Sequence, residues 1–279
     1  MQGLEVFSLY TVYCILLFVY ICVHSWLNTY SKMSFFPKGI FVTGTDTGVG
    51  KTVVSAALAW TLKGSGKRVA VIKPVQTGTD SGGGMDIEFT QRVIGTSYLL
   101  DDVCPYRFPL PLAPSVASRL AEEKIDLRKI NSNFYNLSSN HDVVIVEGAG
   151  GLLVPITDNY LMSDLARDLG LYLVIVTRPN LGTLNHTLLT TESANHRGLK
   201  ILGIVINKFP PNPGIAERTN PELILKMTGE PIIGVLPFDP EICVEEGKIG
   251  RLREMADSCF SPELGGSFIL DDFLSNLRI

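Results

Sequence analysis

The hydrophobic pattern from residue 38 onward alternates short apolar runs, rich in β-branched residues, with longer amphipathic stretches. Runs that are apolar throughout are typical of parallel strands that helices cover on both faces. The pattern predicts strands at 39–43, 68–73, 142–147, 171–177, 200–207 and 231–236.

The stretches between these runs carry apolar residues at helical spacing. They predict helices at 51–63, 85–94, 114–121, 127–137, 161–169, 183–196 and 221–227. Strands that alternate with helices in this way build an α/β fold, namely a doubly wound, mostly parallel sheet with helices on both faces. The tail from residue 240 onward shows no chemical signal, and we expect it to pack as one or two helices.

Polar residues follow several of the predicted strands at the point where each strand ends. Residues 45–52 follow the first strand, and Lys73 and Thr77 follow the second. Glu147 and Asn207 stand at the ends of two later strands. Ligands of doubly wound folds bind beyond the carboxyl ends of the strands. We therefore expect the functional site at this edge of the sheet.

The segment FVTGTDTGVGKT, at residues 41–52, has the features of a phosphate-binding loop. It departs from the strict pattern by one position, because Thr45 stands where the first glycine belongs. Gly48 and Gly50 allow a tight turn whose N–H groups point inward. Lys51 supplies a cation, and Thr52 supplies a hydroxyl at a helix start. The alternative is a turn that only connects a strand to a helix. The strand before it, the helix after it and the G-K-T junction favour a P-loop that binds nucleotide.

Phosphoryl transfer needs Mg²⁺ held by oxygen ligands, usually carboxylates together with the loop hydroxyl. Glu147 follows the apolar run VVIV and precedes GAGG, so we expect its carboxylate at the ligand edge of the sheet rather than as an ordinary surface acid. Spacing alone leaves Asp86 open: it fits a second ligand and equally an acid that acts on the dipole of a helix start.

Lys73 ends the run VAVIK, and Pro74 prevents its continuation as an ordinary strand. A lysine at this place can hold a carboxylate or stabilise charge on a transferring phosphoryl group. It can also be an ordinary lysine at a strand end, whose ammonium group extends into solvent without a functional role. The nearby Thr77–Gly78 pair favours the functional interpretation.

The formal net charge is −4 at pH 7, and no run of Lys or Arg appears. We therefore expect no nucleic-acid partner, whereas a local cationic site for small anions is compatible with an acidic chain. The five cysteines form no C-x-x-C pair, which predicts reduced thiols and a cytoplasmic protein.

Residues 6–31 contain no Asp, Glu, Lys or Arg and are long enough to cross a bilayer as a helix. They can be a signal peptide, a membrane anchor, or sequence upstream of a true start at Met33. A signal peptide fits worst, because Glu5 is the only charge at its beginning. We favour the start at Met33, since the remainder reads as a complete soluble enzyme. This divides the chain into a hydrophobic leader at 1–32 and one P-loop domain at 33–279. A membrane partner is expected only if the leader is real.

With these motifs in their order, the chain resembles the dethiobiotin synthetases, a family of ATP-dependent ligases. The matching stretches are FVTGTDTGVGKT, KPVQTG, VEGAGG, LGTLNHTLLT and GIVINK, which together cover roughly residues 39–240. The displaced first glycine is what the GTDT-x-x-GKT loop of that family shows.

The resemblance implies a reaction of biotin biosynthesis. Carbon dioxide adds to one amine of 7,8-diaminononanoate, and an oxygen of the resulting carbamate attacks the γ-phosphate of ATP. The second amine then displaces phosphate and closes the ring. The resemblance also implies Mg²⁺ as cofactor, ATP as co-substrate and a homodimer whose C-terminal residues complete the substrate pocket. No stretch of this chain matches those C-terminal residues, so the contact to the substrate carboxylate is unassigned.

The same resemblance implies roles for individual residues. Lys51 and Lys73 would be the catalytic cations, and Thr52, Asp86 and Glu147 would hold Mg²⁺. The diamine or its carbamate would contact Thr47, Thr77, Gly150 and Asn185. ATP would be bound by Gly48, Val49, Gly50, Lys51, Thr52, Val53, Asp86, Glu147, Gly148, Ala149, Gly150, Asn207, Lys208, Pro237, Phe238 and Asp239.

Two other classes share a related loop. An amidotransferase-type ligase needs a glutaminase domain with a nucleophilic cysteine, for which no room remains after residue 240. A membrane-tethered relative of the partitioning ATPases needs a further lysine near the start of the loop, where this chain has Gly44, Thr45 and Asp46. We rank both below the synthetase.

Overall fold

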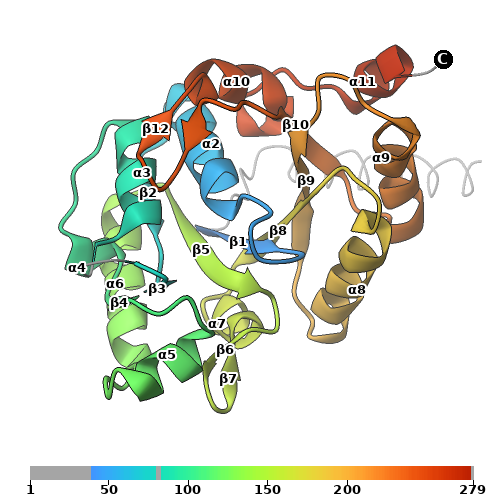
Figure 1. Cartoon of the computed structure of the whole chain (residues 1–279). Helices are drawn as coiled ribbons and strands as arrows, with labels where there is room; N and C mark the ends of the chain where they lie inside the picture. Colours follow the sequence, from blue (N-terminus) through green and yellow to red (C-terminus); the bar gives the residue numbers. More distant parts are fainter. Residues whose placement is uncertain (1–38, 80–82, 278–279) are drawn as a thin grey trace, which may run out of the picture. The chain divides into compact units, whose positions relative to one another are not determined.

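A parallel sheet forms the centre of the computed structural model, which describes residues 39–79 and 83–277 (Figure 1). Six strands lie in the order β10-β9-β8-β1-β5-β2, and all neighbours run parallel. Their bounds are β1 Gly39–Gly44, β2 Val69–Ile72, β5 Val143–Gly151, β8 Tyr172–Thr177, β9 Ile201–Phe209 and β10 Ile232–Pro237. The sheet confirms the predicted fold class. The expected leader at 1–32 lies outside the described residues.

The strand order places the functional edge near the middle of the sheet. β1 lies between β5 and β8, and the chain builds β2 and β5 on one side of β1 before it builds β8, β9 and β10 on the other. Such a reversal opens a crevice beyond the carboxyl ends of the central strands. The segments that follow β1, β5 and β9 therefore come together at one edge.

Helices follow the strands in the predicted alternation. Their bounds are α2 Lys51–Gly64, α3 Met85–Ile94, α5 Pro114–Leu120, α6 Leu127–Asn140, α7 Met162–Asp168, α8 Thr183–His196 and α9 Ile215–Thr228. All six residues of β1 are buried, and because side chains alternate along a strand, both faces of the sheet must be covered. α2 packs against β1, β2 and β5 and also contacts α3 and α10, Leu252–Cys259. No helix in the described part of the chain has the length and apolar character to span a bilayer.

The start of α9 corrects one prediction. A helix was expected at 221–227. The helix instead begins at Ile215, after Gly214, and runs through Pro221. The proline removes one helical N–H donor, but the neighbouring Asn220 anchors this turn by donating from Nδ2 to the carbonyl of Pro179, 2.7 Å away. Tertiary contact here outweighs the local preference.

The tail forms two helices, α10 and α11, Leu270–Leu277, with the 3-10 turn Pro262–Leu264 between them. It also forms a hairpin of β11, Ile242–Cys243, and β12, Lys248–Ile249, which was not predicted. Strands of two or three residues carry no readable periodicity. For the same reason the prediction missed β3 Val75–Thr77, α4 Leu100–Val103, β4 Tyr106–Phe108, β6 Pro155–Thr157 and β7 Tyr160–Leu161.

Candidate functional site

The phosphate loop joins β1 to α2 and depends on glycine for its shape. Gly48 and Gly50 have φ angles of +74° and +92°, a region that other residues rarely adopt. A side chain at Gly50 would also collide with Nδ2 of Asn207. Asn207 stands in β9 and donates from that nitrogen to the carbonyl of Val49, 2.9 Å away. The loop is thus held from the β9 side, with its N–H groups at the start of α2.

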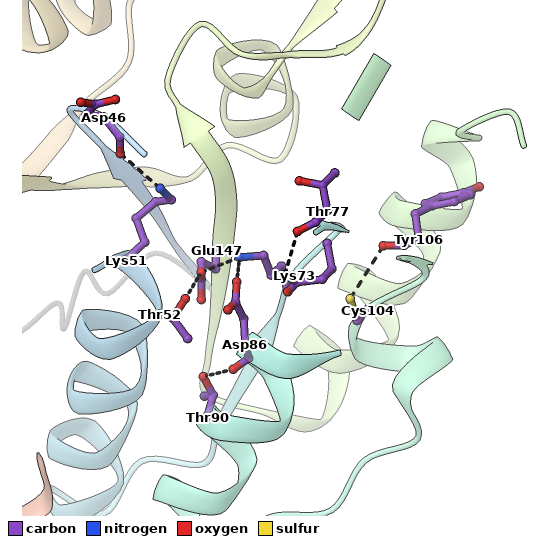
Figure 2. A network of polar contacts seen from close by, with 11 residues as sticks. Asp46, Lys51, Thr52, Lys73, Thr77, Asp86, Thr90, Cys104, Tyr106 and Glu147 are labelled. Carbon is purple, nitrogen blue, oxygen red and sulfur yellow. Dashed lines mark hydrogen bonds and ion pairs between the residues drawn. The ribbon is translucent and has the colours of Figure 1, made fainter. Parts of the chain in front are cut away.

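Lys51 opens α2 with its side chain almost fully buried. Its ammonium lies 3.5 Å from the carbonyl oxygen of Asp46 in the same loop (Figure 2). Burial lowers the pKa of Lys51 to about 8, and repulsion by Lys73 contributes to this shift. A buried lysine with a lowered pKa favours a nearby anion, because an anion restores the stability of the charged form.

A buried polar cluster lies beside the loop and joins four chain segments. Nζ of Lys73 donates to Oε1 of Glu147 at 2.7 Å and also to the carboxylate of Asp86. The hydroxyl of Thr52 donates to the same Oε1 of Glu147 at 2.8 Å. Figure 2 shows Lys73 between the two carboxylates, with Thr52 on the other side of Glu147. The structure thus brings together the residues predicted as catalytic lysine and metal ligands.

Burial and charge oppose each other in this cluster. Burial lowers the pKa of Lys73, but the carboxylates of Glu147 and Asp86 outweigh it and hold the pKa above its usual value, so the lysine stays charged. Burial raises the pKa of Glu147, and Lys73 opposes that rise. The second oxygen of Glu147, Oε2, is buried without a hydrogen-bond partner among the described residues. A buried carboxylate oxygen in this state is a favourable ligand for a further cation.

The donor set fits Mg²⁺. Thr52, Asp86 and Glu147 present one hydroxyl and two carboxylates, which are hard oxygen ligands. Within residues 39–79 and 83–277, no three His, Cys, Asp or Glu side chains cluster in a way that could cage a metal. Mg²⁺ suits such an open set, because it is commonly bound by one or two carboxylates together with substrate phosphates and water.

A pocket of about 440 Å³ lies over the loop and the cluster. Most of the predicted site residues line it, namely Thr47, Gly48, Gly50, Lys51, Thr52, Val53, Lys73, Thr77, Asp86, Glu147, Ala149, Gly150, Asn207, Lys208, Pro237, Phe238 and Asp239. The polar segments at the ends of the predicted strands thus share one cavity, whose place agrees with the sequence prediction.

Three predicted residues are not part of this lining. Val49 is fully buried and offers only its backbone to the loop. Gly148 lies against the ring of Phe41, where a side chain would be crowded. Asn185 is exposed on the first turn of α8. Its contact with the diamine stays a prediction.

Two residues at the β9 and β10 side of the pocket stabilise its walls. Lys208 adopts a φ of +60° and donates from Nζ to the carbonyl of Gly48, 3.0 Å away. The carboxylate of Asp239 accepts the backbone N–H of Glu241 at 3.0 Å and that of Arg251 at 2.9 Å. Asp239 therefore ties together the two ends of the β11–β12 hairpin.

Sequence reasoning missed several residues that line the pocket. Ile242, Val244 and Glu245 come from the β11–β12 segment, for which no motif gave a signal. Gln76, Met85 and Pro111 also line it. Gln76 could have been predicted as a site residue, because it stands inside KPVQTG between Lys73 and Thr77.

The cysteines in the described range agree with the predicted reduced state. Cys104, Cys243 and Cys259 are free thiols. Burial raises the pKa of Cys104 to about 12, so this thiol is neutral at physiological pH. Cys14 and Cys22 belong to the part of the chain outside the described residues.

Comparisons with known proteins place this site in a family context. The profile of a family described as an AAA domain matches residues 38–245. The ATP-dependent dethiobiotin synthetase BioD of Bacillus subtilis (strain 168) is 42% identical over 205 residues, which cover 72% of this chain and 87% of that protein. The enzyme of the same name from Anaeromyxobacter sp. (strain K) is 40% identical over 215 residues, covering 77% and 96%.

Among solved structures, the chain is similar to the septum site-determining protein MinD of Pyrococcus horikoshii OT3, complexed with Mg-ADP. The TM-score is 0.51 at 19% sequence identity, and the match covers 86% of this chain and 98% of that one. A likeness at this identity shows the fold alone.

Proposed function

The chain belongs to the ATP-dependent dethiobiotin synthetase family, and we propose on that premise that it carboxylates 7,8-diaminononanoate and closes the ureido ring at the expense of ATP. The observation that carries this proposal is the buried contact of Lys73 with Glu147 and Asp86 beside the phosphate loop. It provides a cation and a metal-binding set at the place where a phosphate would lie.

The reaction balances in three steps. An unprotonated amine attacks CO2, forms a C–N bond and loses one proton to give the carbamate. A carbamate oxygen attacks the γ-phosphorus of ATP, the bond to the β-phosphate oxygen breaks, and ADP leaves. The second amine attacks the carbonyl carbon and displaces phosphate, which closes the ring and releases the remaining proton. Mg²⁺, when bound, supplies charge neutralisation at the phosphate oxygens.

The residues of this chain supply positioning and positive charge. The N–H groups of the phosphate loop would hold the triphosphate at the start of α2. Lys51 and Lys73 would offset the negative charge that gathers on the γ-phosphate and the carbamate, at a place where burial makes each interaction stronger than in water. Thr52, Asp86 and Glu147 would hold Mg²⁺, and with it they would help to keep the γ-phosphate in place for the carbamate.

The strand order supports one orientation of ATP and the diamine across the pocket. Asn207 and Pro237 come from β9 and β10 at one side of the sheet, whereas Lys73 and Thr77 follow β2 at the other. The phosphate loop, after β1, stands between them. We place the adenine on the β9 and β10 side and the diamine on the side of Lys73 and Thr77, with the γ-phosphate between them.

The assembly we propose is a homodimer. Asn185 and Leu189 stand four residues apart in α8 and share one of its faces, and Leu181 lies in the turn just before the helix begins. Leu181 and Leu189 are 90% and 57% exposed. A second copy that covers this face would shield the leucines and bring Asn185 toward a pocket across the interface. Light scattering that shows only monomers at micromolar concentration would contradict the dimer.

A phosphate-release assay tests the proposed reaction. The purified full-length protein with Mg-ATP and bicarbonate is expected to release phosphate much faster when 7,8-diaminononanoate is present, and mass spectrometry is expected to detect dethiobiotin. The alternative is an ATPase switch with the fold of the MinD proteins. Release that is independent of the diamine, without dethiobiotin, would favour the switch.

A further inference from the structure

A buried glutamine in the pocket has an acceptor atom without a partner. Gln76 belongs to β3, is only 4% exposed and lines the pocket. Its Nε2 donates to the carbonyl of Thr77 at 3.3 Å, which orients the amide. Its Oε1 is buried and has no hydrogen-bond partner in the part of the chain that the structure describes. Such an atom costs free energy unless something donates to it.

The chemistry of this atom limits what can satisfy it. An amide oxygen can only accept, so its partner is a hydrogen-bond donor or a metal cation. Phosphate oxygens of ATP and the oxygens of a carbamate are acceptors and cannot fill this role. The amines of a diamine and the N–H of a carbamate are donors. Because Gln76 lines the pocket, three residues after Lys73 and directly before Thr77, it belongs to the side of the pocket where we place the diamine.

We propose that Gln76 is a substrate-binding residue whose Oε1 accepts a hydrogen bond from one of the two amino groups of the diamine. This inference rests on the proposed function, because it names a donor on that substrate. Gln76 binds one particular nitrogen and thereby fixes which amine faces the carbonyl carbon during ring closure. It distinguishes the diamine from an analogue that lacks this nitrogen, since the analogue would leave Oε1 buried and unpaired.

The test compares Gln76→Met with the unaltered protein. Methionine has nearly the same length and shape but no acceptor of comparable strength. Calorimetry measures the affinity for the diamine and for 7-aminononanoate and 8-aminononanoate, each in the presence of Mg²⁺ and a non-hydrolysable ATP analogue. We expect Gln76→Met to weaken the diamine and one monoamine roughly five- to tenfold, which is the usual effect of one lost hydrogen bond. The other monoamine is expected to bind both proteins equally.

Gln91→Met is the matched control. Gln91 in α3 does not belong to the pocket lining, and both ends of its amide pair with Tyr98: Oε1 accepts the backbone N–H at 2.7 Å, and Nε2 donates to the carbonyl at 3.3 Å. Its replacement is expected to lower the melting temperature and to leave the diamine affinity unchanged. Gln76→Met is expected to lower the diamine affinity and to leave the melting temperature nearly unchanged, because the oxygen that it removes has no partner among the described residues.

Several outcomes would overturn the role of Gln76. One is an unchanged affinity of Gln76→Met for the diamine. Another is an equal loss for both monoamines, which would indicate a structural effect. A loss confined to the Mg²⁺-dependent affinity for the ATP analogue would assign the oxygen to the metal. Failure of the proposed function looks different, since the unaltered protein would then show no diamine binding and no diamine-dependent phosphate release.

Discussion

Lys73 and Glu147 form a buried ion pair with 2.7 Å between Nζ and Oε1, and the same lysine also holds Asp86. The side chains of Lys73 and Glu147 are 6% and 0% exposed. One cation therefore contacts both of the carboxylates predicted as metal ligands in a place that water barely reaches. The pair connects the end of β2 with β5, so the charge that would act on the substrate is also part of what positions the metal ligands.

Replacing Lys73 by Met is expected to lower turnover by about 10²- to 10³-fold, because it removes a cation from the transition state. It also leaves buried carboxylate charge without a partner, which we expect to lower the free energy of unfolding by about 3 kcal/mol. Chemical denaturation and the phosphate-release assay measure the two effects.

The double variant Lys73→Met with Glu147→Gln separates these effects. It is expected to recover most of the lost stability, because the fully buried carboxylate charge of Glu147 is gone and Asp86 is partly exposed to solvent, and to recover no activity. The matched control is Lys63→Met, which removes a lysine that donates to the carbonyl of Ile94 away from the pocket. Near-normal turnover of Lys73→Met would refute the assigned catalytic role.

Replacing Gly50 by Ala is expected to abolish measurable ATP binding. The residue has a φ of +92°, and a side chain there would collide with Asn207, which holds the loop. Equilibrium dialysis or calorimetry with ATP measures the loss.

Gly66 provides a control with nearly the same backbone. Its φ is +85°, but a side chain there would meet no atom within 4 Å. Gly66→Ala is expected to cost about 1 kcal/mol of stability from the backbone alone and to leave ATP affinity unchanged. Equal ATP binding by Gly50→Ala and unaltered protein would show that the loop geometry does not matter for the nucleotide.

The sequence revealed those parts of the fold and site that follow from local rules. Strands buried on both faces, such as Phe41 and its neighbours, are visible as unbroken apolar runs. Lys73 and Glu147 converge because the carboxyl ends of parallel strands meet at one edge, and Asp86 joins them from the first turn of α3. The roles of the individual residues could be predicted only from the family resemblance, since spacing alone did not decide whether Asp86 is a metal ligand.

Other features depend on contacts between distant segments and left no pattern in the sequence. The β11–β12 hairpin has strands of two residues and is held by Asp239, whose partners Glu241 and Arg251 are distinguishable only in three dimensions. The predicted helix at 221–227 began too late, because α9 starts at Ile215 and runs through Pro221, where Asn220 anchors it to the carbonyl of Pro179. Oε1 of Gln76 lacks a partner among the described residues because of how the chain buries it, which no sequence motif reveals.

At the edge of the sheet opposite the site, one ion pair is expected to make the stability of the fold depend on pH. Arg68 and Asp142 precede β2 and β5 and are joined at 2.7 Å. Hydrogen bonds from Arg68 lower the pKa of Asp142 from 3.8 to about 2. Because the folded pKa is depressed, the contribution is complete above pH 4 and is lost as the pH falls toward 2. The melting temperature of Asp142→Asn should therefore approach that of the unaltered protein between pH 5 and pH 3, while both have equal turnover at neutral pH. A constant difference across this range would contradict the assignment.

The β11–β12 hairpin is expected to respond to nucleotide, and Cys243 reports on it. Cys243 is a partly exposed free thiol between Ile242 and Val244, which both line the pocket. ATP that contacts these neighbours should slow the alkylation of Cys243 by iodoacetamide severalfold, as site-resolved mass spectrometry would measure. Cys259 is the internal reference, since it is buried and burial raises its pKa.

Asp239→Ala removes the acceptor of both backbone N–H groups at the ends of the hairpin. This variant is expected to react faster at Cys243, to lose protection by ATP and to show a KM for ATP raised about tenfold, which corresponds to about 1.4 kcal/mol. Equal alkylation rates with and without saturating ATP would exclude the hairpin from the nucleotide site.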